Sequence, residues 1–301
     1  MTEATVSPSA PTAPRFEPAL MRRKLTGTLF YGVCLAAIAI LIMTLVALLI
    51  NVLVSGVPYL SMDFITGVPS RRPADAGIWP ALVGSIEIAI MVAALTFPLG
   101  IGAAIYLAEY ATDNRFTRLM QTNISNLAGV PSIIYGIFGL AIFVRLLGFG
   151  PVLFSGAATL SMVILPLVII ASIEALRAVP QGQREGAYAL GASQWQMVKG
   201  SVLPAAAPGI MTGIILAMAR AIGEAAPLVV IGAATFVLTV PKPFEGGFNV
   251  LPIQIFNWAQ RPQAAFQDLA AAAIIVVLVL IFFLNLLAVV IRARLSRHIQ
   301  W

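Results

Sequence analysis

Cysteine, histidine and charged residues are scarce in this chain of 301 residues. Cys34 and His298 are the only members of their types, so the chain by itself cannot form a disulfide, a Cys/His zinc site or a histidine-based catalytic triad. Charged residues make up 10% of the chain, whereas a soluble domain carries about 25%. With 60% hydrophobic residues, the composition excludes an ordinary soluble enzyme and indicates a membrane-embedded protein.

Nucleotide-binding and catalytic patterns are missing as well. No G-x-x-x-x-G-K-[ST] sequence occurs, so the chain has no P-loop with which to hydrolyse ATP. Glu87 and Glu224 are the acids well inside apolar runs, and they lie in different runs with nothing to pair them as a catalytic dyad. We therefore expect a non-catalytic chain that binds no metal or cofactor.

Six apolar runs are long enough to cross a bilayer, whose hydrocarbon core of about 30 Å needs roughly 20 helical residues. We expect transmembrane helices at approximately 28–54, 81–108, 127–147, 155–177, 205–237 and 268–292. The first run is too long for the apolar part of a signal peptide and has no cleavage site after it, so we expect it to be retained. The predicted fold class is an all-α, multi-pass integral membrane protein.

Lysine and arginine define the orientation of these spans, because basic loops stay on the cytoplasmic side. With the N-terminus inside, 12 of the 18 basic residues are cytoplasmic, 5 are outside, and Arg220 lies within the fifth span. Both termini are therefore expected in the cytoplasm. Because the positive charge follows one membrane face, it does not indicate a nucleic-acid partner.

The fifth span carries the charged residues that most need an explanation. A charge in the hydrocarbon region costs several kcal/mol, so Arg220 and Glu224 require a polar environment or each other, and their spacing places them on one face of a helix. An arginine suits phosphate, because its planar fork donates paired hydrogen bonds and stays charged. The alternative is an ion pair that only fixes helix packing.

Small residues spaced by four run beside that face and predict close packing on another helix. They are Gly209, Gly213, Ala217, Ala221 and Ala225. Three further side chains are candidates for a polar pathway: Glu87 in the second span, and Ser132 and Tyr135 beside the Pro131 break in the third. A helix-packing role is an equal alternative for the two hydroxyl residues.

The loop over residues 178–204, between the fourth and fifth spans, is too polar to enter the bilayer. Its pattern predicts two short helices at an angle, with a break at Gly191 and Ser193 as the N-cap of the second helix. We call this segment the elbow. Such a knob close to the membrane is either a grip for a cytoplasmic protein or a plain connector.

The elbow carries a resemblance to a known family. Its residues Glu185, Gly186, Ala187, Gly191, Leu203 and Pro204 resemble the EAA signature, E-A-A-x3-G-x9-I-x-L-P, of bacterial ABC importer permeases. Gly186 replaces the second alanine, and Ser201 stands where the signature has an aliphatic residue. The resemblance implies a type I ABC importer permease fold, in which this loop docks on the ATPase subunit.

Two further segments narrow the resemblance. Residues 219–228, ARAIGEAAPL, are similar to a stretch of the phosphate-specific permeases, the PstA type in particular, and residues 129–136, GVPSIIYG, are similar to another segment of that family. The resemblance covers roughly residues 80–292. It implies a permease subunit that forms half of the path for inorganic phosphate across the bacterial plasma (inner) membrane.

The resemblance also implies partners. These are a second homologous permease of the C type, an ATPase homodimer that uses ATP and Mg²⁺, an external phosphate-binding protein, and membrane lipid. We divide the chain into a disordered cytoplasmic tail over 1–24, a first span with its outer loop over 25–80, the permease core over 81–292, and a cytoplasmic tail over 293–301. The long, proline-rich outer segments 55–80 and 238–267 read as plain loops or as contacts for an external partner.

Two other functions stay open. Arg220 alone would suit another oxyanion, sulfate or molybdate, equally well, because a guanidinium recognises the charge and geometry that these ions share. A secondary transporter is the other alternative, although the chain shows no repeated halves.

Overall fold

The computed structural model describes residues 20–233 and 236–296. Every regular element in this part of the chain is a helix, which confirms the predicted all-α class. The predicted tail lies outside the described residues up to position 19, as do residues 297–301 of the C-terminal tail. By contact the chain divides into two units, residues 1–51 and 52–301, and each is described by itself.

The first unit consists of most of helix α1 (Leu20–Gly56). At 1.5 Å per residue its 37 residues measure about 55 Å, which exceeds the roughly 30 Å of a hydrocarbon core. Large apolar side chains are exposed along its length, as expected for a helix surrounded by lipid or other helices. Because α1 begins at Leu20, the boundary predicted at residue 24 lies inside the helix.

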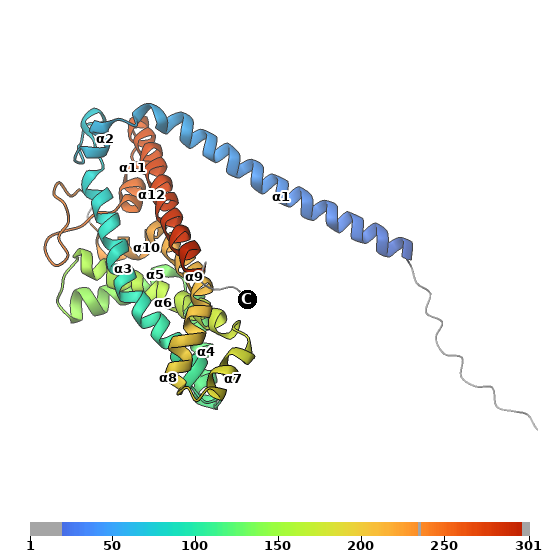
Figure 1. Ribbon diagram of the computed structural model, residues 1–301. Helices are drawn as coiled ribbons and strands as arrows, with labels where there is room; N and C mark the ends of the chain where they lie inside the picture. The colour runs from blue at the N-terminus through green and yellow to red at the C-terminus, as the bar shows by residue number, and fades with distance from the viewer. Residues whose placement is uncertain (1–19, 234–235, 297–301) are drawn as a thin grey trace, which may run out of the picture. The chain divides into compact units, whose positions relative to one another are not determined.

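The second unit contains the other helices, which Figure 1 shows in chain order. Its α-helices are α2 (Met62–Thr66), α3 (Trp79–Ile105), α4 (Arg115–Ala128), α5 (Ser132–Gly139), α6 (Leu153–Arg177), α7 (Gln181–Ala189), α8 (Gln194–Met197), α9 (Leu203–Gly223), α10 (Ala226–Ile231), α11 (Leu251–Ala259) and α12 (Ala264–Ser296). Short 3₁₀ turns are η1 (Val57–Tyr59) and η2 (Pro73–Asp75). There are three π-helical segments in the described part of the chain. The segment η3 (Tyr106–Tyr110) continues α3, η4 (Leu140–Leu146) continues α5, and η5 (Val198–Val202) joins α8 to α9.

Five helices of the described chain are long and apolar enough to cross a membrane, and a bent pair raises the number to six. The five lie at Arg23–Tyr59, Trp79–Tyr110, Leu153–Arg177, Gln194–Gly223 and Ala264–Arg294. These spans match five of the six predicted from the sequence, apart from the end of the fifth.

The third predicted span, 127–147, is not one straight helix. The chain bends by 101° between α4 and the helix that runs from Ser132 to Leu146. Pro131 has no N–H to donate to the carbonyl of Leu127, and its ring crowds that carbonyl, so a helix cannot continue through it. This carbonyl accepts instead from the Val130 N–H at 3.1 Å and from the Tyr135 hydroxyl at 2.8 Å.

The fifth predicted span, 205–237, is also broken. Helix α9 ends at Gly223, Glu224 adopts extended backbone angles, and α10 begins at Ala226. Pro227 is the cause, because its i−4 neighbour is Gly223, the last residue of α9. Helix α10 ends at Ile231, because its C-cap Gly232 has a left-handed φ of +93°, so the prediction of a continuous helix to residue 237 was wrong.

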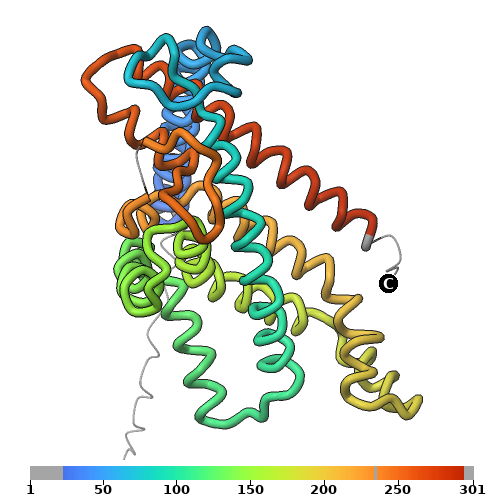
Figure 2. Tube along the Cα trace, turned by 90° about the vertical axis from the view of Figure 1, so that its left-hand side faces the viewer, coloured from blue at the N-terminus to red at the C-terminus, as the bar shows by residue number. Residues whose placement is uncertain are grey.

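The core of the second unit lies where α3, α6 and α9 pack together. Leu153, Leu160, Ile164 and Val168 of α6 are almost completely buried, which makes α6 the central helix. Figures 1 and 2 show α2 and α11 near one end of this unit and α7 and α8 at the other. The predicted outer segments and the predicted elbow are therefore at opposite ends, as the orientation rule requires.

The outer segment 238–267 is not a plain loop. It contains α11, whose Leu251 and Trp258 are buried against α3 and α12, while Ile253 is buried in the core cluster of α3 and α6. A nine-residue helix with prolines around it is too short to register as a span, so its burial could not be read from length alone.

The stripe of small residues on α9 packs against α6, as predicted. A Cβ at Gly209 would lie 2.8 Å from the Cβ of Ala175, and one at Gly213 would overlap the Cβ of Ala171. Ala217 and Ala221 continue the stripe and are buried. Close backbone approach thus depends on the absence of side chains here.

We expect Gly213→Ala to destabilise the protein by about 1–3 kcal/mol, because the added methyl group overpacks a tight helix contact. Gly102→Ala in α3 is the matched control, since a Cβ there meets nothing within 4 Å. Thermal unfolding of the purified protein in detergent measures both. Equal unfolding temperatures for the two variants would contradict this packing.

Candidate functional site

The predicted charge pair forms at the break between α9 and α10. Arg220 Nε lies 3.3 Å from Glu224 Oε1, with Arg220 in the last turn of α9 and Glu224 one residue beyond its end. The two residues do not share a face of one continuous helix, as the spacing had suggested. The unwound backbone at Glu224 instead brings the carboxylate to the guanidinium.

Arg220 is only partly covered by its own chain. Its side chain is 46% exposed, whereas that of Glu224 is 18% exposed. At 1.5 Å per residue Arg220 lies about 25 Å along α9 from Leu203, deep in the predicted span. Because exposing a guanidinium to lipid is costly, its open side must face water, a partner chain or a polar ligand.

The exposed face of α9 extends on both sides of the pair. Leu216 is 68% exposed one turn before Arg220, and Gly223 is exposed three residues after it. A Cβ at Gly223 meets nothing within 4 Å. An open surface therefore surrounds the guanidinium, while α6 occupies the glycine side of α9.

The two broken spans meet beside this pair. Helix α5 packs on α10 so closely that a Cβ at Gly136 would lie 2.8 Å from the Cα of Pro227. Val130 and Ala225, next to the two breaks, belong to one apolar cluster with Tyr135. The interruptions in the third and fifth spans thus lie next to each other in the fold.

The three other predicted pathway residues have different surroundings. Tyr135 is buried, and its hydroxyl is committed to the Leu127 carbonyl, as a packing role requires. Ser132, the first residue of α5, is half-buried. Glu87 in α3 forms no ion pair with Arg220, and its Oε2 is buried without a hydrogen-bond partner in the described chain.

The elbow has the predicted shape. Gly191, with a φ of +79°, turns the chain between α7 and α8, and the Ser193 side chain caps α8 in a reciprocal capping box with Gln196. The π segment η5 then leads into α9 at Leu203 and Pro204. Glu185 and Gly186 are exposed on α7, and Ala187 packs against the nearby core.

Apolar side chains on the elbow point away from the chain. Leu190 is 90% exposed, Trp195 is 57% exposed and Tyr188 is 47% exposed. Tyr188 lies on α7, Leu190 is its C-cap, and Trp195 lies on α8. This composition is typical of a protein-docking surface rather than of a plain connector.

A buried ion pair holds the elbow to the end of α3. Arg184 of α7 binds both carboxylate oxygens of Glu109, at 2.7 and 3.2 Å, and donates to the carbonyls of Leu176 and Val179. The two charged side chains are 13% and 5% exposed. The hydrogen bond to Glu109 raises the pKa of Arg184 above its ordinary value, although burial opposes the shift.

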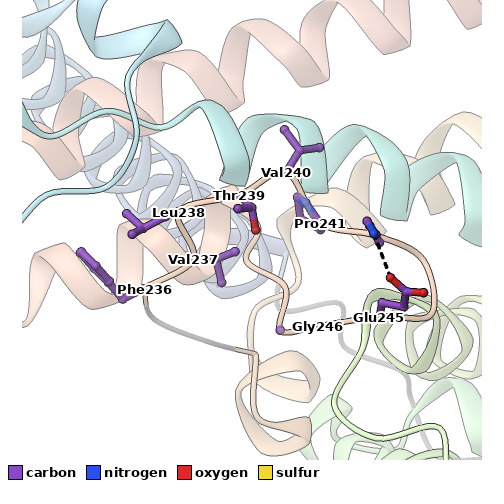
Figure 3. A pocket seen from close by; sticks show the side chains of 10 residues that line it. Phe236, Val237, Leu238, Thr239, Val240, Pro241, Glu245 and Gly246 are labelled. Carbon is purple, nitrogen blue, oxygen red and sulfur yellow. Dashed lines mark hydrogen bonds and ion pairs between the residues drawn. The ribbon is translucent and has the colours of Figure 1, made fainter.

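A pocket of about 570 Å³ lies in the outer segment, within residues 236–247. Figure 3 shows Phe236, Leu238 and Val240 along one stretch of chain, followed by the turn that Lys242 and Glu245 close with an ion pair of 2.9 Å. Both charged side chains are more than 70% exposed, so this ion pair stabilises the surface turn only slightly.

Comparison with known proteins identifies the family. Residues 97–297 match the family described as binding-protein-dependent transport system inner membrane component. The chain belongs to this family. The matched region contains the elbow, the charge pair and both broken spans.

Relatives cover most of this permease. It is 38% identical over 250 residues to "Probable ABC transporter permease protein YqgI" of Bacillus subtilis, covering 80% of this chain and 82% of the relative. It is 33% identical to the phosphate transport system permease protein PstA of Yersinia pestis, with 83% and 84% coverage. It is 31% identical to the PstA protein of Haemophilus influenzae, with 88% and 93% coverage.

Solved structures show the same fold. A bacterial alginate ABC transporter, in complex with an alginate pentasaccharide-bound periplasmic protein, matches with a TM-score of 0.62 at 17% identity and covers 93% of this chain and 97% of that chain. The inward-facing MetNI methionine ABC transporter matches with a TM-score of 0.57 at 17% identity, covering 73% and 94%. The expected permease fold of ABC importers is confirmed.

The Arg184–Glu109 pair was missed in the sequence. Its partners are 75 residues apart, and each lies in a polar stretch where charges are unremarkable. The buried side-chain pair of Asn249 and Gln254 was also missed, because the outer segment had been read as a loop. The Arg184–Glu109 pair leaves no local signal, because its partners come together only when α3 and α7 pack. The Asn249–Gln254 pair is local, five residues apart, but it forms at the start of a helix that had not been predicted.

We expect Gly191→Ala to loosen the elbow, because a left-handed backbone costs a non-glycine residue about 1 kcal/mol. Gly186→Ala, five residues earlier, is the matched control: it lies inside α7, meets nothing within 4 Å, and should stabilise that helix by up to about 1 kcal/mol. Amide hydrogen exchange over residues 181–197 should become faster in the first variant and slower in the second. The same direction in both would show that the turn at Gly191 does not constrain the elbow.

Proposed function

We propose that this chain is the permease subunit of an ATP-driven phosphate importer and forms half of the path for inorganic phosphate across the bacterial inner membrane. The observation that carries the proposal is the Arg220–Glu224 pair, half open to the outside of the chain within a predicted span. Its relatives in Yersinia pestis and Haemophilus influenzae are phosphate transport permeases, which supports phosphate as the substrate.

The geometry of the pair suits transient binding of an oxyanion. With one edge of Arg220 held by Glu224, the remaining N–H groups on its exposed side are available to donate to phosphate oxygens. The adjacent carboxylate offsets part of the positive charge. Weaker binding favours transport, since an ion that binds too tightly does not leave.

Glu87 and Ser132 complete the proposed pathway set together with Tyr135. The Oε2 of Glu87 is buried without a hydrogen-bond partner in the described chain, so in this proposal it gains a polar contact only when α3 moves. The Tyr135 hydroxyl acts indirectly in this scheme, because it holds the Pro131 break closed at the Leu127 carbonyl.

The energy for transport comes from a partner in this proposal. The chain has no P-loop, so ATP and Mg²⁺ are used by a separate ATPase homodimer, and this subunit is not itself an enzyme. The exposed apolar side chains of the elbow supply the docking surface for that ATPase. Closure of the ATPase pair would push the elbow and, through η5, the helix that carries Arg220.

Two more partners follow from the same scheme. A second permease of the C type would cover the open face of α9 and supply the other half of the path. An external phosphate-binding protein would dock at the end of the unit opposite the elbow, near α2 and α11. The exposed Phe244 and Leu238 of the outer segment offer an apolar contact surface.

Phosphate uptake by cells that carry Arg220→Gln tests the proposal. We expect uptake to fall about tenfold or more, because a charge-assisted hydrogen bond contributes about 1.5–3 kcal/mol. The amount of assembled complex in the membrane and its ATPase activity should be retained. Arg145→Gln is the matched control. Arg145 is an exposed arginine in the last turn of η4, at the end of the third span, and should tolerate the change.

Two results would contradict the proposal. Loss of the complex from the membrane in Arg220→Gln would show that the pair only fixes packing. Intact phosphate uptake in a strain without this chain, together with loss of sulfate or molybdate uptake, would show that the substrate is a different oxyanion.

A further inference from the structure

The elbow has two connections to the membrane helices. The covalent one runs from α8 through η5 into α9, at whose end Arg220 lies. The other is the Arg184–Glu109 pair, which joins α7 to the π segment at the end of α3. Gln194 of α8 strengthens this second connection by donating to the backbone carbonyl of Glu109 at 2.6 Å.

The second connection has the geometry of a rigid joint. The Arg184 guanidinium makes four hydrogen bonds in one plane of donors, two to the Glu109 carboxylate and two to carbonyls at the end of α6. A planar fork with four of its five N–H donors engaged fixes orientation as well as distance. Helices α3, α6 and α7 are therefore locked together at a single side chain.

Stability alone does not account for a buried ion pair here. Apolar residues of similar volume often hold two segments as firmly, because burying charges costs desolvation energy. Apolar packing is already present, since Ala187, Met197 and Leu107 lie in one cluster between the elbow and the end of α3. The charged fork adds a fixed relative orientation of the elbow and α3, which apolar packing alone does not define.

We propose that the Arg184–Glu109 pair is a positioning joint that transmits movement of the elbow to α3, so that α3 and α9 move together when the ATPase acts. This role rests on the proposed function, because it assigns a task to the elbow within an ATP-driven transporter. Glu109 lies in a π segment, a distortion that recurs at functional sites in helices. Helix α3 extends from this joint to the outer end of the unit and carries Glu87 (Figure 1).

The test separates movement of α3 from movement of α9. Cys34 is replaced by serine, and a single cysteine is introduced at Ile86 of α3 or at Gly223 of α9, both of which are exposed. The labelling rate of each cysteine by a thiol reagent is then measured in the assembled complex with and without ATP. In the otherwise unchanged complex, ATP should alter both rates.

The decisive variant is Glu109→Leu with Arg184→Met, which removes both charges and keeps apolar bulk for folding. We expect ATP still to alter labelling at position 223, while its effect at position 86 falls about fivefold or more, the lower end of typical coupling between sites. Stimulation of ATP hydrolysis by the phosphate-loaded binding protein should fall in parallel. Asp113→Asn is the matched control, because it breaks the exposed Asp113–Arg118 pair at the same end of the unit.

If ATP still altered the labelling rates at both positions in the double variant, the Arg184–Glu109 pair would not be needed to transmit movement to α3. Loss of the assembled complex in the double variant and in Arg184→Lys alike would also overturn the proposal, since the pair would then be structural. A failure of the proposed function looks different: ATP would alter neither rate in the unchanged complex, or the phosphate-loaded binding protein would not stimulate hydrolysis there.

Discussion

Backbone groups in a bilayer core must find their hydrogen bonds inside the protein, and this constraint governs the second unit. Two prolines, Pro131 and Pro227, each stop a membrane helix and free a carbonyl one turn earlier. The structure places both interruptions together, with α5 packed on α10 and the Tyr135 hydroxyl closing one of them. Broken helices are tolerated here because each covers the other.

The break between α9 and α10 also allows the charged Arg220 and Glu224 to pair within a membrane span. Once α9 has ended, Glu224 can turn back to Arg220, and the pair lies at the edge of the packed breaks instead of in the core. At the other end of α9, the elbow presents exposed apolar side chains around the turn at Gly191. A single helix thus connects the elbow to Arg220, and in the proposed function it joins the ATPase docking surface to the phosphate path.

Much of this could be predicted from the sequence, because apolar length and signature spacing are local properties. The spans, the bend at Gly191, the Ser193 cap and the α6-facing glycines all follow from short-range patterns. The breaks at Pro131 and Pro227 were underestimated, since proline is tolerated within α3, α6 and α9 at Pro98, Pro166 and Pro208. The Arg184–Glu109 pair and buried α11 depend on tertiary packing, which leaves no local trace.

Whether Arg220 faces an aqueous path is the central claim, and cysteine labelling tests it directly. With Cys34 replaced by serine, Gly223→Cys should react with a membrane-impermeant thiol reagent in the assembled complex, and phosphate should slow the reaction. Phe282→Cys, at an exposed apolar position of α12, should stay unlabelled in the lipid. Equal lack of labelling at both positions would contradict the account, because Arg220 would then border a dry interface.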